Sequence, residues 1–206
     1  ESPANNTAMG YNSLAANTTG YDNTAVGGYA LDCLYRSGIT NITIVDYDCF
    51  EETNQNRQIG SDAIGVSKVE HLKTLYPKII AIEAKIDLEW IENNDLNEYD
   101  LILDAIDDIK PKVQIIKRYY KKLVSTTGSA KRLDPTKIEY INIWKTHNDP
   151  FAKKIREELK KIRFNKNFKV IFSSELPQCK DLGSFVGVTG SFGLAMCSKA
   201  MDKLSQ

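Results

Sequence analysis

Three features that often reveal the class of a protein are missing from this sequence. No apolar run approaches the roughly 20 residues that a membrane-spanning helix needs, so we expect no membrane partner. The four cysteines, at positions 33, 49, 179 and 197, form no C-x-x-C pair, which argues against structural zinc and favours a reduced, cytoplasmic protein. The net charge is zero, with 27 basic and 27 acidic residues, so nucleic-acid binding can be argued only from local clusters.

Residues 1–26 differ in pattern from the rest of the chain. The pentapeptide at 6–10, NTAMG, recurs as NTAVG at 23–27. This pattern resembles the turn-rich repeats of trimeric adhesin heads and phage fibres, which bury their apolar positions only by stacking roughly three or more copies. We therefore expect residues 1–26 to be a poorly ordered or grafted segment, with a trimerising module as the alternative. The adjoining domain is expected at 27–206.

The remainder of the chain has an α/β pattern. Short apolar runs that read as strands alternate with segments of helical periodicity, and Asp149-Pro150 reads as the cap and first turn of one such helix. This alternation predicts a Rossmann-like, mostly parallel sheet flanked by helices. The expected strands are 42–45, 79–84, 101–103, 123–127 and 168–172, and a terminal helix is expected within 184–204.

The stretch from Asn41 to Lys68 carries the strongest functional signal. A strand that ends on Asp46 is followed by a polar cluster with Arg57, and a helix then opens with Lys68 in its first turn. In nucleotide-binding α/β folds, an acid at a strand end reaches the ribose hydroxyls. Arginine and lysine supply the positive charge that polyphosphate requires. The order of these residues predicts a nucleotide site.

Several motifs, taken in their order along the chain, resemble those of the ThiF/MoeB-type adenylating fold of the ubiquitin-activating-enzyme-like proteins. Within that fold the sequence is most similar to the tRNA threonylcarbamoyladenosine dehydratases, from about Gly27 to the C-terminus. The motifs are IVDYD at 44–48, TNQNRQ at 53–58, GVSK at 65–68, DAID at 104–107, STTGSA at 125–130, DPTKI at 134–138, DPFAKKIREELKK at 149–161 and FSSELP at 172–177.

The resemblance implies adenylation of a substrate carboxylate by ATP with Mg²⁺. In the dehydratases this carboxylate belongs to a threonylcarbamoyl group on a tRNA adenosine, and the neighbouring ureido group then closes a ring. Such chemistry needs positive charge on the phosphates and a metal more than an acid–base pair. Asp104 is interpreted as structural. The residues implied for the nucleotide, the catalytic charge and the metal are Gly27 and Gly28, Asp46 for the ribose, Asn54 or Asn56 for loop order, Arg57 and Lys68 for the phosphates, and Asp107 for Mg²⁺.

The sequence departs from the family at the glycine-rich loop that cradles phosphates. Gly27 occupies the last glycine position of G-x-G-x-x-G, but Asp22 and Thr24 occupy the first two. Polar residues 16–20 stand where the first strand is expected. Side chains and a negative charge would fill space that the triphosphate needs, so we expect the ATP affinity to be impaired.

Two partner classes remain open at this stage. Cations in one short helix predict tRNA binding by Lys117, Arg118, Lys121 and Lys122. The alternative is an enzyme that activates a ubiquitin-like sulfur carrier, in which Cys179 would act with a sulfur-transfer protein. The absence of C-x-x-C pairs favours the dehydratase over this alternative. The resemblance also implies a homodimer, and a non-catalytic binding or oligomerising protein is the third interpretation.

Overall fold

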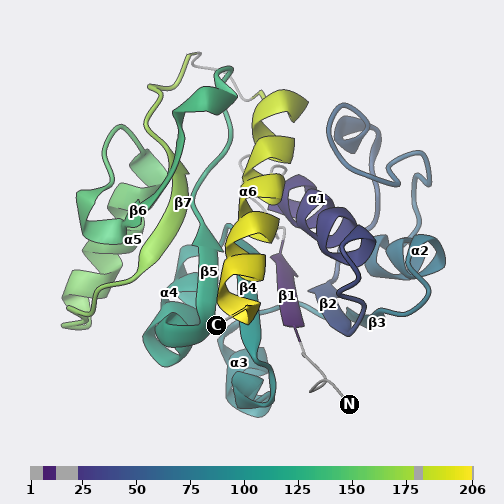
Figure 1. The fold of residues 1–206 in the computed structure, drawn as a ribbon, viewed down its shortest axis with the longest axis horizontal. Helices are drawn as coiled ribbons and strands as arrows, with labels where there is room; N and C mark the ends of the chain where they lie inside the picture. Colours follow the sequence, from purple (N-terminus) through teal and green to yellow (C-terminus); the bar gives the residue numbers. More distant parts are fainter. Residues whose placement is uncertain (1–6, 13–22, 179–182, 206) are drawn as a thin grey trace.

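The computed structural model describes residues 7–12, 23–178 and 183–205, which form one seven-stranded sheet with helices on both faces (Figure 1). The strand order is β3-β2-β1-β4-β5-β7-β6, and every pairing is parallel except that of β6 with β7. This arrangement confirms the predicted Rossmann-like α/β fold. The strands are β1 (Thr7–Asn12), β2 (Ile42–Asp46), β3 (Ile80–Glu83), β4 (Leu101–Ile106), β5 (Leu123–Thr126), β6 (Ile138–Asn142) and β7 (Lys169–Ser173).

The helices divide the core into two layers. Alternate residues of β4 face opposite sides of the sheet: Leu101 and Leu103 pack in the layer with α1, α2 and α6, and Ile102 and Ile106 in the layer with α3, α4 and α5. The helices are α1 (Asn23–Arg36), α2 (Lys68–Leu75), α3 (Leu88–Asn93), α4 (Ile109–Tyr119), α5 (Pro150–Lys161) and α6 (Val186–Leu204).

The position of β1 differs from the sequence prediction. Thr7–Asn12 pairs with β2 on one side and β4 on the other, at the centre of the sheet, although these residues belong to the segment expected to be poorly ordered or grafted. Residues 16–20, where the strand was sought, lie outside the described residues. The central strand escaped detection because TAMGYN lacks the β-branched run typical of a buried parallel strand. The domain boundary at residue 27 stays a prediction.

Other elements follow the sequence closely. The side chain of Asp149 accepts a hydrogen bond from the backbone N of Ala152 at 2.9 Å, which confirms the predicted cap of α5. The strand β6 was not predicted. It is short, half-buried along its length and antiparallel at the sheet edge, so its sequence lacks a strong strand pattern.

One prediction about the cysteines is wrong. The structure joins Cys33 of α1 to Cys197 of α6 in a disulfide with a Cα–Cα distance of 6.1 Å, whereas the sequence favoured reduced cysteines. The two helices approach closely because Gly193 of α6 has no side chain, and a Cβ there would overlap the backbone of Val26 and the Cβ of Tyr29. Among the described residues, no helix combines the length and apolar character that crossing a membrane requires.

Candidate functional site

Two of the predicted nucleotide residues lie at the carboxyl ends of β2 and β4, on either side of β1. Asp46 is the last residue of β2, and Asp107 directly follows β4. From β1 the sheet continues to β2 in one direction and to β4 in the other. Ligands of open α/β sheets bind where the strand order reverses in this way, outside the carboxyl ends of the strands.

Asp46 is almost completely buried, with 1% of its surface exposed. Its Oδ1 accepts a hydrogen bond from the backbone N of Asp48 at 2.9 Å. Burial raises the pKa of the Asp46 carboxyl to about 7, an effect that the nearby Lys68 ammonium opposes. Asp46 and Lys68 are therefore electrostatic neighbours, as the nucleotide interpretation requires.

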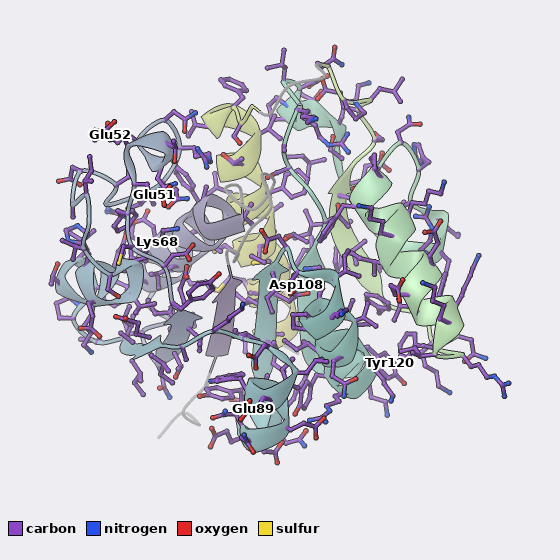
Figure 2. All side chains as sticks on the ribbon, turned by 180° about the vertical axis from the view of Figure 1, so that it is seen from behind. Glu51, Glu52, Lys68, Glu89, Asp108 and Tyr120 are labelled. Atoms are coloured by element: carbon purple, nitrogen blue, oxygen red, sulfur yellow. A yellow bond between two sulfur atoms is a disulfide. The ribbon has the colours of Figure 1, made fainter. Side chains whose placement is uncertain are left out.

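Lys68 links the start of α2 to the loop after β2. Its Nζ lies 3.1 Å from Oδ2 of Asp48, and its backbone N donates to the carbonyl of Asp48 at 2.9 Å. Only 3% of Lys68 is exposed, so the ammonium is held in place beside two carboxyl groups. In Figure 2, Lys68 lies on the same side of the molecule as Glu51.

The cluster between β2 and α2 is ordered by its own side chains. Asn54 is buried, and its Oδ1 accepts a hydrogen bond from the backbone N of Glu51 at 3.0 Å. Arg57 donates through Nη1 to the Thr53 carbonyl at 2.5 Å and to Oδ1 of Asn56 at 2.6 Å. Both asparagines thus order the loop, with Asn56 acting directly on the guanidinium.

Asp107 is a buried carboxyl group without a hydrogen-bond partner on either oxygen among the described side chains and backbone of other residues. Burial raises its pKa to about 7, and the nearby Lys112 ammonium opposes this shift. Tyr47 lies close by, since burial and the charges of Asp46, Asp48 and Asp107 raise the pKa of its hydroxyl. The sequence interpretation did not single out Tyr47, although it stands between the two acids of the DYD triplet in IVDYD.

Asp104 has the structural role that the sequence indicated. Its carboxylate contacts Nζ of Lys112 at 2.8 Å, Oγ of Ser125 at 2.6 Å and the backbone N of Ile106 at 2.9 Å. Lys112 is completely buried, so this cation of α4 is not available to bind RNA. Its four-carbon stem lies inside the core and only its ammonium finds polar partners, an arrangement that periodicity alone does not distinguish from an exposed lysine.

The remaining cations of the α4 cluster lie far along the sheet from Asp46 and Asp107. They stand at the end of α4 and in the following turn, just before the first residue of β5, and so near the amino ends of the strands. In Figure 2, Tyr120 of this turn and Lys68 lie on opposite sides of Asp108. Arg118 donates to the carbonyl of Ile91, and Lys122 to the carbonyls of Leu96 and Tyr99, while Lys117 and Lys121 are exposed.

The glycine positions differ from a phosphate-binding loop. Gly27 and Gly28 are buried within α1, and Thr24 lies in the first turn of that helix. A Cβ at Gly28 would meet only the Cβ of Ile59, at 3.9 Å, so close packing does not require this glycine. Asp22 and Cys179 lie outside the described residues.

The chemistry of the site fits a nucleotide and a divalent cation. Mg²⁺ is commonly bound through one or two carboxylates, with water and substrate phosphates completing its shell. The unpartnered carboxyl of Asp107 suits that role. Within the described residues no group of three or more His, Cys, Asp or Glu could hold a metal, so a cation here would depend on phosphate oxygens.

Comparison with known proteins agrees with this geometry. The sequence matches the ThiF family model over residues 24–206. A tRNA threonylcarbamoyladenosine dehydratase from Bacillus subtilis is 36% identical over 163 residues, which cover 74% of this chain and 64% of the relative. An Escherichia coli protein of the same name is 34% identical over 146 residues, covering 66% of this chain and 54% of the relative. The chain therefore spans less than two thirds of the length of these two relatives.

Solved structures give the same result. The Escherichia coli tRNA N6-threonylcarbamoyladenosine dehydratase in complex with AMP superposes with a TM-score of 0.84 and 28% identity, covering 98% of this chain and 87% of that chain. The same protein in complex with ATP gives a TM-score of 0.81 at 28% identity, with coverage of 98% and 86%. The fold, the ordered motifs and the match over most of the chain lead to one conclusion: the chain belongs to the ThiF family.

Proposed function

We propose that this chain is an ATP-dependent adenylating enzyme that acts as a tRNA threonylcarbamoyladenosine dehydratase. The observation that carries the proposal is the placement of Asp46 and the unpartnered Asp107 at the carboxyl ends of β2 and β4, with Lys68 of α2 beside Asp46. The names of the similar proteins and the nucleotides in their complexes support it.

The proposed roles follow from the charge and placement of each side chain. Asp46 would accept hydrogen bonds from ribose hydroxyls, while Arg57 and Lys68 would bind phosphate oxygens and hold the α-phosphate for attack by the substrate carboxylate. Asp107 would hold Mg²⁺ in its ionised form. Positive charge and metal at the phosphates stabilise the charge that develops as pyrophosphate leaves.

The tRNA would be bound through exposed cations, and Lys117 and Lys121 are the members of the predicted group best placed to contact phosphate. Arg118 and Lys122 have protein partners and would contribute less. We also propose a homodimer and a cytoplasmic location, as the resemblance implies. The altered glycine positions and Thr24 in the first turn of α1 support a reduced affinity for ATP.

Activation of a ubiquitin-like carrier is the second candidate, because the ThiF fold itself does not distinguish acyl substrates. Here Cys179 and a sulfur-transfer protein would take part. A third candidate, a non-catalytic oligomer, is motivated by the repeat NTAMG and NTAVG at the N-terminus.

AMP release separates the three candidates. AMP formation that depends on threonylcarbamoyladenosine-containing tRNA supports the dehydratase, and dependence on a carrier with a C-terminal Gly-Gly supports the second candidate. The same assay on a chain in which residues 1–28 are replaced by an apolar strand and G-x-G-x-x-G measures the impairment. If neither chain forms AMP with either substrate, while both are folded, the enzyme proposal is wrong.

A further inference from the structure

A cavity of about 300 Å³ lies between the sheet and the α3–α4 layer, and its wall extends to the carboxyl ends of β2 and β4 at Val45 and Ile106. Its walls are mostly aliphatic and include Val45, Ile82, Ile102 and Ile115. It reaches the surface beside Asn93, an exposed residue at the end of α3. In Figure 1, α3 lies at the end of the sheet where β1 and β4 begin. Protein interiors are normally close-packed, so a space of this size is unusual.

The register of β1 explains why space remains there. Gly10 pairs with Val45 on one side and with Asp104 on the other, and both of these partners line the cavity. A glycine in the central strand brings no side chain to this level of the sheet. The sequence of the central strand therefore contributes to the cavity, whose surface end is formed by the segment between α3 and β4.

The lining specifies a chemical class of ligand. The inner wall is aliphatic, whereas polar groups gather at the surface end with Asn93, Asn94 and Tyr99. No described lining residue is Lys, Arg or His. Among the described residues, the charged ones in the lining are Asp95, Glu98 and Asp104, and all three are acidic.

These acidic groups differ in how closely a lysine neutralises them. Asp104 is neutralised by Lys112 inside the core. Lys122 lies near Asp95 and binds the carbonyls of Leu96 and Tyr99, so it is occupied by the protein. From the described lining, an anionic ligand would meet carboxylates and no free cation, whereas a neutral ring with one polar end matches both parts of the wall.

We propose that this cavity is a binding site for a small, neutral aromatic molecule with an amide-like polar end. The ring lies against the aliphatic wall beneath β1, and the polar end lies near Asn93 and Asn94. Val45 and Ile106 line the cavity, and each directly precedes one of the two acidic residues of the proposed nucleotide site, Asp46 and Asp107. The proposal stands independently of the proposed enzymatic function.

Trp90 lines the cavity and provides the measurement. The chain has two tryptophans, so the Trp144→Phe variant emits from Trp90 alone. We expect 4-bromobenzamide to quench this emission saturably, because bromine quenches tryptophan on contact. The matched anion 4-bromobenzoate should bind at least about tenfold more weakly. Absence of saturable quenching, or equal binding of the two compounds, would overturn the proposal.

Two neighbouring substitutions locate the ligand. Ile115 lines the cavity, so Ile115→Phe fills it and should weaken bromobenzamide binding about tenfold or more while the Tm is kept or raised. Ile116 is buried but does not line the cavity, so Ile116→Phe should lower the Tm and leave the affinity of the folded protein unchanged. Unchanged binding in Ile115→Phe, or equal loss in both folded variants, would contradict the assigned place.

Discussion

Among single residues, Asp107 combines burial with an unpartnered charge, and this predicts a pH-dependent stability. The pKa of its carboxyl rises from 3.8 to about 7 on folding. Between these values the folded state holds a proton that the unfolded state has released, so the free energy of unfolding falls as the pH rises from about 4 to about 7. Asp107→Asn should remove this loss and stabilise the protein at pH 8 by on the order of 2 kcal/mol.

Urea denaturation of both proteins at pH 5 and pH 8 measures the effect. The matched control is Asp108→Asn, which changes an exposed neighbouring carboxyl group and leaves a good capping residue at the start of α4. Part of the pH dependence should persist in Asp107→Asn, because the pKa of Asp46 is also raised to about 7. If the free energy of unfolding changed between pH 5 and pH 8 by the same amount in Asp107→Asn as in the parent protein, this carboxyl group would not be the source of the pH dependence.

Lys68 is the second residue with a sharp consequence. Its ammonium pairs with Asp48 and also faces the buried Asp46. Removing the charge with Lys68→Met leaves these carboxyl groups without their cation, which should lower the free energy of unfolding by about 2 kcal/mol at pH 8 and weaken ATP binding. Chemical denaturation and calorimetric titration measure the two effects. Lys68→Arg keeps the charge and should recover most of the stability; equal losses in both variants would mean that packing, not charge, dominates.

At the scale of elements, the central strand β1 predicts that the N-terminal segment cannot be removed. Thr7–Asn12 pairs along both edges, so its loss would expose the facing edges of β2 and β4 in the middle of the core. Deletion of residues 1–12 should abolish cooperative unfolding, measured by heat or urea. The milder Gly10→Pro variant removes one ladder donor and leaves its carbonyl partner unpaired, which should lower the free energy of unfolding by about 1–3 kcal/mol. A deleted chain that unfolds cooperatively with an unchanged midpoint would support a separable appendage, as the domain boundary at residue 27 assumes.

The contrast between β1 and β2 shows what the sequence could reveal. Ile42–Asp46 is a continuous apolar run closed by an acid, so both the strand and the placement of Asp46 were predictable. The run Thr7–Asn12 was hidden because its partners, not its own composition, make it a strand. The ion pair of Lys112 with Asp104 was equally hidden, since eight residues and a helix turn separate two groups that meet only in the folded core.

For the whole molecule, the contact of α1 with α6 joins the two ends of the fold. The disulfide between Cys33 and Cys197 closes a loop with a sequence separation of 164. Such a cross-link restricts the unfolded chain and typically stabilises by about 2–4 kcal/mol. In a domain of this size that corresponds to a fall in Tm of roughly 4–16 °C when the bond is removed.

We therefore expect Cys33→Ala to lower the Tm by this amount. A reducing agent should then have no further effect on the Tm, because the variant has no disulfide at Cys197 to reduce. The free thiol of Cys49 is exposed and provides the matched control, so Cys49→Ala should leave both the Tm and its response to reductant unchanged. Thermal unfolding of the parent protein and both variants, with and without reductant, measures all six cases. If the parent protein and Cys33→Ala melted at the same temperature without reductant, the link would contribute nothing, and the close packing of α1 against Gly193 of α6 would alone hold the two helices together.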